Sequence, residues 1–574
     1  MLRSTSLGTT VLALVLVSGG VAPRALAQAV KGRPRGDGPA PLSYRGVVPG
    51  VTTAEELREK LGPPIHEAEW YAWKLLYPAE GAPGHFDAIH MQASKAGEGT
   101  IGTIEAASVP AGYETLGALR ARLGAPEYWL TLPSGQHIVD YSEKGLRFAV
   151  DARDRTIGVA YFPNGDARVH SGERRRVDLS RLPEGPREPL ADSAPAPDLL
   201  AGAAEVDISP APEHWPREFR MVTPLRARCA VFARGDLRVA IAGADLFGML
   251  KSEIDPIAAR LREQGIDHLL VSSSHDHAAP DSIGIYGFYP ADWVAAIQSG
   301  IERGVLAAAA RLRPVEQLLV GARDLPLTGA RVEGLFRNAR NPGIVDPQIA
   351  VVEARGEDDR PIVTIVQFAC HVEGIASGES EFTADFPGYL CDTLRERRGA
   401  QAVFLNGAVG GMVSGDTRAR THEESLRMGT RLADEIGALL EIATPSRTNG
   451  FACRQKRLEI PVTNLKFIAF QRLHAGRRPE ARGRLITEMF HLRLGDAEFL
   501  SVPGELLPEV SFELLEQMRG YPRMIVGLAN DQLGYLIPGY DFRLGVYEES
   551  MSPGPAAAPL VKECGLRLID EARP

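Results

Sequence analysis

The sequence predicts an α/β (α+β) protein in which a small α+β tandem-repeat domain precedes a larger domain with a mixed central sheet. Three observations lead to this prediction. The chain has 574 residues, which is too long for one ordinary domain. Residues 46–165 contain two similar segments, and from about residue 199 strand-like and helix-like segments alternate along the chain.

Residues 1–27 are typical of a signal peptide. Arg3 supplies a positive charge, the apolar run VLALVLV follows, and Ala25–Ala27 form a small-residue cleavage site. The apolar run is shorter than a membrane-spanning anchor requires. We therefore expect cleavage before Gln28 and a periplasmic or secreted protein.

Residues 46–165 are predicted to form the tandem-repeat domain. Thr52–Pro64 (TTAEELREKLGPP) aligns with Glu114–Pro126 (ETLGALRARLGAP), and each is predicted to be a short amphipathic helix that ends at Gly and Pro. Strand-like runs follow each helix. A helix and a small meander, repeated twice, resemble small exported domains of the β-lactamase inhibitor protein type. No cluster of catalytic residue types occurs here, which favours an accessory or binding module.

Residues 166–198 are rich in proline, arginine and acidic residues and lack periodicity, so we expect a linker. Residues 199–574 are expected to form the second domain. Its first part alternates between the strand-like runs LRVAIAGADLF and HLLVSSS and the helix-like runs EIDPIAARLREQG and WVAAIQSGIERGVLAAAARL. This alternation is typical of α/β layer architectures.

Composition excludes some classes of protein. The net charge of −9 and the pI of about 5.9 argue against a nucleic-acid-binding function. The five cysteines form no CxxC pair and do not indicate a disulfide framework. We expect buried free thiols.

Three histidines follow strand-like runs. Leu269–Ser274 leads to His275 and His277, whose side chains lie on the same side of an extended chain. A second buried strand, Val363–Cys370, leads directly to His371. Functional groups in α/β domains gather at the carboxyl ends of strands, so we expect these side chains to meet there. Taken alone, the HxH pair fits two surface or hydrogen-bonded histidines equally well.

Two further strand-like runs end near a candidate ligand. EFLSVPGELLPEV places Glu505 after a Pro–Gly turn, and MIVGLANDQLGYLIP leads to Tyr535. Taken alone, Glu505 fits an acidic residue at a helix N-terminus, and Tyr535 fits a core or rim tyrosine. Together with the histidines they have the ligand chemistry of a catalytic zinc site. The sequence has no HExxH motif and no GxSxG motif, which weakens the zincin and α/β-hydrolase interpretations.

The order of these motifs resembles the neutral/alkaline (non-lysosomal) ceramidase family, which consists of zinc-dependent amidases of lipid N-acyl bonds. The resemblance covers most of residues 200–555. The matching segments are AGAAEVDISPAP (Ala201–Pro212), SSSHDHAAPDS (Ser272–Ser282), FACHVEG (Phe368–Gly374), TADFPGYL (Thr383–Leu390), FLNGAVGGMVSGD (Phe404–Asp416), VPGELLPE (Val502–Glu509), and GLANDQLGYLIPGYDF with VYEES.

The resemblance implies a ligand set for zinc. It implies that His275 and His371 are the zinc histidines and that Glu505 is the zinc carboxylate. Tyr535 matches a tyrosine that lies close to the metal or binds it.

The resemblance also implies roles beyond the ligands. His277 matches a histidine that assists proton transfer or holds the oxyanion. Ser414 falls at the serine of the family's GDVSPN-like loop, a position proposed as a nucleophile. Asp385 is expected either to orient a ligand imidazole or a loop, or simply to cap the segment FPGY.

The sequence departs from the family pattern near the candidate site. HDHAAP replaces HTHSGP, so we expect Asp276 to add a charge beside the histidines, and Met412 replaces the acid of the GDVSPN-like loop. We expect no counterpart of the family's immunoglobulin-like C-terminal domain. These departures leave the zinc hydrolase prediction in place and put ceramide itself in question.

Two sets of residues bear on the substrate. Arg337 and Arg340 are expected at the surface, where they could meet an anionic or hydroxylated head group. The stretch Gly284–Trp293 (GIYGFYPADW) carries four aromatic residues, Tyr286, Phe288, Tyr289 and Trp293, which either line an apolar entrance for an acyl chain or pack into the core, the commoner case.

We therefore expect an exported zinc-dependent amidohydrolase that cleaves an N-acyl amide bond of a ceramide-like lipid. Its partners are expected to be a small-molecule or lipid N-acyl amide and, peripherally, a membrane, but no nucleic acid. Three alternatives remain open. They are the same scaffold acting on a non-ceramide amide or ester, a non-catalytic lipid- or glycan-binding protein, and a serine hydrolase built on Ser414.

Overall fold

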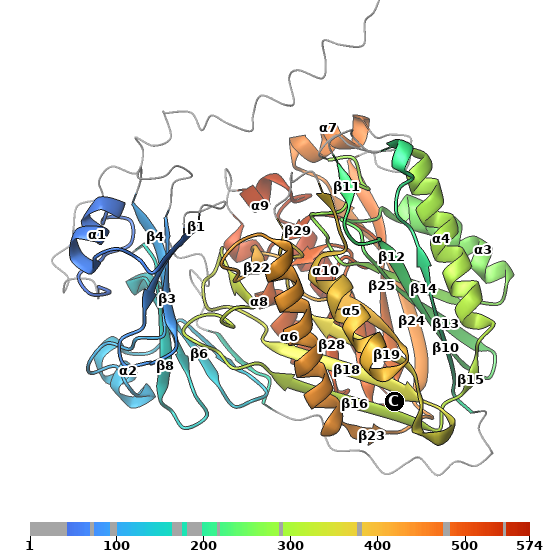
Figure 1. The fold of residues 1–574 in the computed structure, drawn as a ribbon, viewed down its shortest axis with the longest axis horizontal. Helices are drawn as coiled ribbons and strands as arrows, with labels where there is room; N and C mark the ends of the chain where they lie inside the picture. Colours follow the sequence, from blue (N-terminus) through green and yellow to red (C-terminus); the bar gives the residue numbers. More distant parts are fainter. Residues whose placement is uncertain are drawn as a thin grey trace, which may run out of the picture. The chain divides into compact units, whose positions relative to one another are not determined.

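The computed structural model in Figure 1 describes most of the chain after the predicted signal peptide, which lies outside the described residues. Within the described part, no helix has the length and apolarity needed to cross a membrane. The described residues are 43–68, 74–91, 100–163, 175–180, 198–214, 219–285, 291–375, 381–473, 483–542 and 547–573.

The N-terminal part forms one nine-stranded sheet with the strand order β1-β2-β3-β4-β8-β7-β6-β5-β9. A helix followed by four strands occurs twice along the chain. The elements are α1 (Ala54–Leu61), β1 (His66–Ala68), β2 (Lys74–Pro78), β3 (Phe86–Met91), β4 (Ile101–Ala106), α2 (Leu116–Leu123), β5 (Tyr128–Thr131), β6 (His137–Tyr141), β7 (Leu146–Val150), β8 (Thr156–Tyr161) and β9 (Arg175–Asp178).

Local sequence signals explain both helices of this sheet. The Thr53 side chain accepts a hydrogen bond from the Glu56 amide at 3.2 Å and the Glu56 carboxylate accepts one from the Thr53 amide at 2.8 Å, so α1 begins with a capping box. Gly62 and Gly124 end α1 and α2 with φ angles of 77° and 85°, which residues with a Cβ rarely adopt. Strand β9 lies inside the segment expected to be a linker, and its four residues, RRVD, are too few and too charged to stand out as a strand.

The rest of the described chain contains three sheets of the same topology. Each begins with three antiparallel strands, continues through a helix to a fourth strand parallel to the third, and is followed by a second helix. In the first two sheets a fifth strand pairs with the first.

The first sheet comprises β10 (Leu200–Asp207), β12 (Arg226–Arg234), β13 (Leu237–Ala244), β14 (His268–Ser273) and β15 (Arg313–Pro314), with α3 (Lys251–Glu263) and α4 (Ala291–Ala309). The second comprises β16 (Gln317–Asp324), β18 (Gln348–Arg355), β19 (Pro361–Phe368), β21 (Gln401–Asn406) and β23 (Thr444–Ser446), with α5 (Asp385–Arg398) and α6 (His422–Glu441). The third comprises β24 (Phe451–Pro461), β25 (Arg484–Leu494), β26 (Ala497–Ser501) and β28 (Arg523–Val526), with α8 (Pro508–Leu515) and α10 (Ala557–Glu571).

Short elements lie between these. They are β11 (Arg220–Met221), β17 (Phe336–Asn338), β20 (Glu381–Phe382), β22 (Val413–Gly415), β27 (Glu505–Leu506), β29 (Tyr535–Leu536), α7 (Leu465–Leu473) and α9 (Tyr547–Ser550).

The three sheets share one core. Phe232 of the first sheet, Val352 of the second and Phe499 of the third belong to the same buried apolar cluster. Helices α3 and α4 cover the outer face of the first sheet, α5 and α6 cover the second, and α8 and α10 pack on the third (Figure 1). This layered mixture of helices and mixed sheets confirms the predicted α/β (α+β) class.

The carboxyl ends of the three fourth strands meet at one junction. The Ser272 hydroxyl, in β14, donates to the Gly527 carbonyl oxygen, just after β28, at 3.1 Å. The Gly527 amide donates to the Asn406 carbonyl oxygen, at the end of β21, at 2.9 Å. The Asn406 side-chain amide donates to the Ser274 carbonyl oxygen, just after β14, at 2.7 Å and closes the ring. Polar groups at three strand ends are therefore satisfied across the sheets.

The prediction that the cysteines are free thiols is confirmed. The prediction that they are buried is confirmed for four of the five. All five are free, and Cys453 is partly exposed.

Gly243 of β13 marks a close approach of the first two sheets, and its replacement tests their packing. A Cβ on Gly243 would lie 2.4 Å from the Phe404 carbonyl oxygen of β21. We expect Gly243→Ala to lower the free energy of unfolding by about 1–3 kcal/mol, measured by urea denaturation, because the backbone must shift. Gly437→Ala in α6 is the matched control, since no atom lies within 4 Å of its added Cβ. Equal unfolding free energies for Gly243→Ala and wild type would contradict this packing.

Candidate metal centre

Three histidines converge at the strand-end junction. His275 and His277 follow β14, His371 follows β19, and one ring nitrogen from each lies within 4.8 Å of the other two. His275 and His371 are buried, and His277 is partly exposed. The backbone of His275 has a φ of 66°, a rare value for a residue with a side chain, and this turn follows directly on β14.

Backbone carbonyls orient two of the rings. Nδ1 of His275 lies 2.9 Å from the Phe247 carbonyl oxygen, and Nδ1 of His371 lies 3.3 Å from the Val413 carbonyl oxygen. Because a carbonyl oxygen only accepts hydrogen bonds, each Nδ1 carries the proton and each Nε2 presents a lone pair. Metal-binding histidines are held in the same way.

Glu505 faces both of these lone pairs. Its Oε2 lies 3.5 Å from Nε2 of His275 and 3.3 Å from Nε2 of His371, while its Oε1 accepts a hydrogen bond from the Gln532 side chain at 3.2 Å. Burial favours the neutral acid, but His275 and His371 outweigh it and hold the pKa of Glu505 well below its usual range. Burial also opposes protonation of His371, but the Glu505 carboxylate beside its ring outweighs this and raises the pKa of His371.

A divalent cation fits this set of donors. Oε2 of Glu505 and Nε2 of His277 are buried, and neither has a hydrogen-bond partner among the described residues. Buried polar atoms without such a partner are rare and call for a ligand or an ion. Imidazole nitrogens with one carboxylate oxygen are the donors that zinc prefers in catalytic sites.

His277 differs from the other two histidines in its surroundings. Its Nδ1 lies 3.6 Å from Oε1 of Glu373, and Oε2 of Glu373 accepts a hydrogen bond from Arg420 at 2.9 Å. Burial lowers the pKa of His277 to about 3, so the ring is neutral at neutral pH and able to accept a proton.

The sequence prediction missed Glu373 and Arg420. Glu373 is completely buried, and although burial favours its neutral acid, His277 lowers the pKa of Glu373. The signal was present in the sequence, because Glu373 stands two residues after His371, the same spacing that brings His275 and His277 together. Arg420 lies after β22, and no pattern in the sequence marks it as a site residue.

Tyr535 lies at the edge of the cluster. It is paired with Glu505 in the short parallel sheet of β27 and β29, and its hydroxyl lies 3.5 Å from Nε2 of His371. The hydroxyl also donates to the Met412 sulfur at 3.0 Å. Burial, followed by the Glu505 charge, raises the pKa of Tyr535 well above its usual value, so the phenol keeps its proton. The structure thus places a hydrogen-bond donor beside the histidines.

Ser414 and Asp385 lie near the site, but neither side chain forms a hydrogen bond with the three histidines. The Ser414 hydroxyl is buried and has no hydrogen-bond partner among the described residues, so no base is in place to activate it. Asp385 accepts hydrogen bonds from the amides of Ile375 and Phe386 at 3.1 Å and 2.6 Å. It therefore holds the loop after His371 at the start of α5.

Burial corrects the expectations for two arginines and affects the acidity of Asp276. Asp276 is completely buried, and burial raises the pKa of its carboxyl well above the usual value. Arg337 and Arg340 are also buried, and the prediction that they lie at the surface is wrong. Nε of Arg337 lies 3.2 Å from Glu105, and Nε of Arg340 lies 2.9 Å from Asp541. Both arginines hold parts of the chain together.

Trp293 belongs to the core. Its ring N–H donates to the Ile208 carbonyl oxygen at 2.6 Å, and the ring packs among the apolar residues beneath α4. It does not line an entrance. Tyr286, Phe288 and Tyr289 lie outside the described residues.

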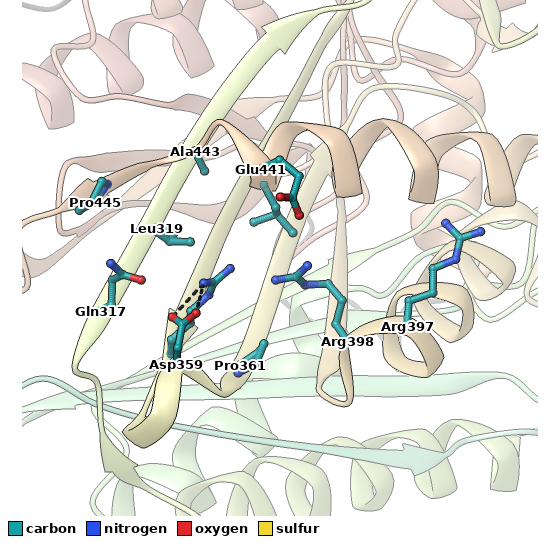
Figure 2. Close-up of a pocket in the computed structure, with 11 residues that line it drawn as sticks. Gln317, Leu319, Asp359, Pro361, Arg397, Arg398, Glu441, Ala443 and Pro445 are labelled. Carbon is teal, nitrogen blue, oxygen red and sulfur yellow. Dashed lines mark hydrogen bonds and ion pairs between the residues drawn. The ribbon is translucent and has the colours of Figure 1, made fainter.

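An open pocket on the second sheet is separate from the histidines (Figure 2). It is lined by Gln317 and Pro361, which begin β16 and β19, and by Arg397 and Arg398 of α5. Because His371 follows the other end of β19, the pocket and the histidines lie at opposite ends of the sheet. The two arginines are already paired, Arg398 with Glu353 at 2.7 Å and Arg397 with Asp434 at 2.6 Å.

Comparisons with known proteins agree with this geometry at the level of the fold. No family model and no curated protein matches the sequence. The solved structure of neutral ceramidase from Pseudomonas aeruginosa matches with a TM-score of 0.53 and 15% identity over 65% of this chain and 75% of that chain. A ceramidase complexed with C2 matches with the same TM-score and identity over 65% of this chain and 76% of that chain. The chain therefore has a fold like that of neutral ceramidases, as the order of its motifs predicted.

Proposed function

We propose that this protein is a zinc-dependent amidohydrolase that cleaves an N-acyl amide bond, with ceramide-like lipids as its substrate class. The observation that carries the proposal is the buried Glu505 carboxylate, which faces Nε2 of His275 and Nε2 of His371 and whose Oε2 has no hydrogen bond among the described residues. These three residues would hold the ion, with Tyr535 beside it. Bound zinc supplies a Lewis acid and lowers the pKa of a water molecule.

The chain's own groups serve the remaining chemistry. Cleavage adds the oxygen of water to the amide carbonyl carbon, breaks the C–N bond and releases an amine that takes up a proton. His277 is neutral, its Nδ1 faces Glu373, and its Nε2 is available to accept a proton and pass it to the leaving nitrogen. The protonated Tyr535 hydroxyl donates a hydrogen bond to the negative charge that develops on the carbonyl oxygen.

Apolar side chains around the site support a lipid substrate. The Phe247 ring lies 4.8 Å from the His275 ring, centroid to centroid. Met412, Phe542 and Met551 pack against the small apolar cluster that contains Tyr535. A site with a few polar groups among apolar walls suits an acyl chain next to a scissile amide. Export through residues 1–27 and peripheral membrane contact accord with such a substrate and belong to the same proposal.

Two competing functions make different predictions. A serine hydrolase built on Ser414 would keep its activity in the presence of a zinc chelator. A binding protein without catalysis would hydrolyse no amide or ester whatever its metal content. A third possibility is that the same scaffold acts on another amide or on an ester. Measuring hydrolysis of a panel of N-acyl lipids and esters distinguishes it from the proposed function.

We expect His371→Ala to lose both zinc and amide hydrolysis while keeping its fold, because one Nε2 ligand is removed. Zinc is measured by elemental analysis after dialysis, hydrolysis by fatty acid release from N-acyl lipids, and folding by circular dichroism. His268→Gln is the matched control, since His268 begins β14, the strand whose other end leads to His275. It should keep one zinc ion per chain and wild-type turnover.

The two parts of the proposal fail separately. One zinc ion per chain in His371→Ala would reject the ligand assignment. A zinc-loaded wild-type protein that releases no fatty acid from any N-acyl lipid would reject the substrate class.

We expect Tyr535→Phe to lower kcat on the order of 10²-fold with little change in zinc content, because the substitution removes a hydrogen-bond donor to the oxyanion. Steady-state kinetics and elemental analysis measure the two quantities. Tyr521→Phe is the control. Tyr521 lies just before the start of β28, at the end of that strand away from the histidines, and its hydroxyl donates to the Ala322 carbonyl oxygen of β16. Loss of zinc in Tyr535→Phe would show instead that the hydroxyl is a ligand, and unchanged kcat would exclude the donor role.

A further inference from the structure

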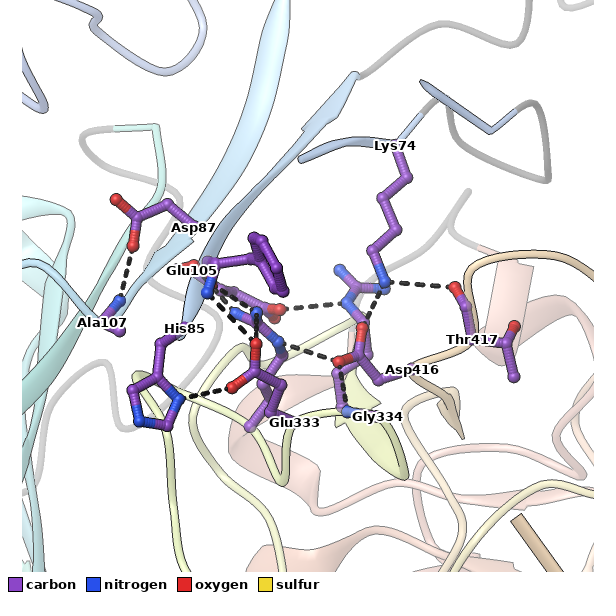
Figure 3. A network of polar contacts seen from close by, with 12 residues as sticks. Lys74, His85, Asp87, Glu105, Ala107, Glu333, Gly334, Asp416 and Thr417 are labelled. Carbon is purple, nitrogen blue, oxygen red and sulfur yellow. Dashed lines mark hydrogen bonds and ion pairs between the residues drawn. The ribbon is translucent and has the colours of Figure 1, made fainter. Parts of the chain in front are cut away.

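The nine-stranded sheet contacts the two-stranded sheet of β17 and β22 through buried charges. We call Lys74, Glu105, Arg331, Arg337 and Asp416 the buried ion cluster (Figure 3). Lys74 and Glu105 come from β2 and β4 of the nine-stranded sheet. The other three come from the region of β17 and β22, which pair with each other antiparallel.

Asp416, one residue beyond β22, is the centre of the cluster. It is buried and forms an ion pair with Lys74, and its Oδ2 lies 2.9 Å from Nε of Arg331 and accepts a hydrogen bond from the Gly334 amide at 2.9 Å. The Lys74 ammonium also donates to the Thr417 carbonyl oxygen at 3.3 Å. Figure 3 shows the Lys74 side chain extended from its strand toward Asp416 and Thr417.

The remaining contacts continue along the same two short strands. Oε2 of Glu105 lies 3.2 Å from Nε of Arg337, and Arg337 is the residue of β17 that stands opposite Ser414 of β22. The Arg331 guanidinium donates to the carbonyl oxygens of Glu105 at 3.0 Å and Phe86 at 2.6 Å. The nine-stranded sheet thus meets β17 and β22 through backbone and side chains together.

The backbones also come close at this contact. A Cβ on Gly158 of β8 would lie 2.0 Å from Cα of Gly329, which stands two residues before Arg331. Such a contact leaves little room for the two parts to slide past each other.

Strand β22 connects this contact to the histidines. The His371 amide donates to the Val413 carbonyl oxygen at 2.7 Å, and Nδ1 of His371 faces the same oxygen at 3.3 Å. Val413 begins β22, and Asp416 follows the end of that strand. The position of β22 therefore sets which way Nε2 of His371 points.

The burial of the charges on Lys74 and Asp416 strengthens the connection between the nine-stranded sheet and β22. Lys74 and Asp416 are both buried, and a buried charge whose partner is removed is costly. Burial favours the neutral Asp416, but Lys74 and Arg331 outweigh it and hold the pKa of Asp416 well below its usual range. Asp416 therefore stays ionised and requires both cations in place.

We propose that the nine-stranded sheet is a positioning element for the metal centre: Lys74 and Glu105 hold β17 and β22 in place, so that the Val413 carbonyl aims Nε2 of His371 at the Glu505 carboxylate. The inference rests on the proposed zinc site and assigns the N-terminal sheet a role in it. Lys74 and Glu105 act through other residues and touch neither the substrate nor the ion.

Lys74→Met in the full-length chain tests this inference. We expect its zinc dissociation constant to rise 10- to 100-fold, because partners that orient a ligand have effects of this size. The measurement is competition with a chromogenic chelator well below the unfolding temperature. Lys74→Arg keeps the charge and should stay within threefold of wild type. Glu105→Gln keeps the volume, removes the other acid of the cluster and should weaken zinc binding in the same direction, which covers the case in which Lys74→Met does not fold.

Tyr44→Phe is the matched control for loss of stability alone. It removes a buried hydrogen bond of 2.7 Å from Tyr44, which precedes α1, to Asp87 of β3. Within the described part of the chain, neither residue forms a hydrogen bond or ion pair with β17 or β22. It should lower the unfolding temperature and leave the zinc dissociation constant unchanged. Wild-type zinc affinity in both Glu105→Gln and folded Lys74→Met, or equal weakening in Tyr44→Phe, would overturn the inference. A wild-type protein that binds no zinc would reject the proposed function instead.

Discussion

The junction of the three fourth strands is the constraint on which the rest of the structure depends. Hydrogen bonds join Ser272 to Gly527, Gly527 to Asn406, and Asn406 to Ser274 across three sheets. A polar group left unpaired at such a buried point is costly, so the three strand ends are held in a fixed relation. His275, His371 and Glu505 follow these strands or the third strands beside them. Their meeting in space is therefore a consequence of sheet assembly.

The site built on this junction combines an anion with two oriented imidazoles. Glu505 stays ionised in a buried place because the histidines offset the cost of burial. The carbonyls of Phe247 and Val413 fix which nitrogen of each ring faces the carboxylate. Ligands prepared in this way need little rearrangement when an ion binds, which favours tight and specific binding. His277 and Tyr535 stand beside these residues. The neutral His277 ring can accept a proton, and the Tyr535 hydroxyl, which keeps its proton, can donate a hydrogen bond.

Sequence patterns revealed the parts of this arrangement that have a local signature. Runs of buried strand residues ending in His275, His371, Glu505 and Tyr535 were visible because strand periodicity and polar strand ends are properties of short segments. The fold class and the likeness to neutral ceramidases followed from the same patterns. The helix starts of the tandem repeat were visible for the same reason, through capping residues and terminal glycines.

The interactions that escaped prediction depend on partners far along the chain. Arg337 and Arg340 have the composition of surface residues, and only the arrival of Glu105 and Asp541 makes their burial tolerable. The raised pKa of Asp276 depends on its burial, and the pairing of Lys74 with Asp416 joins two sheets. Strand β9 takes its conformation from β5 rather than from its own four residues. Tertiary contacts of this kind leave no periodic trace in a sequence.

The central claim is that strand ends distant in the sequence form one zinc site. X-ray absorption at the zinc edge of the metal-loaded protein tests it most directly. We expect at least two imidazole nitrogens at about 2.0–2.1 Å from the zinc ion and a carboxylate oxygen at about 2.0–2.2 Å. Sulfur ligands at about 2.3 Å, or a shell of oxygens without imidazole, would contradict it.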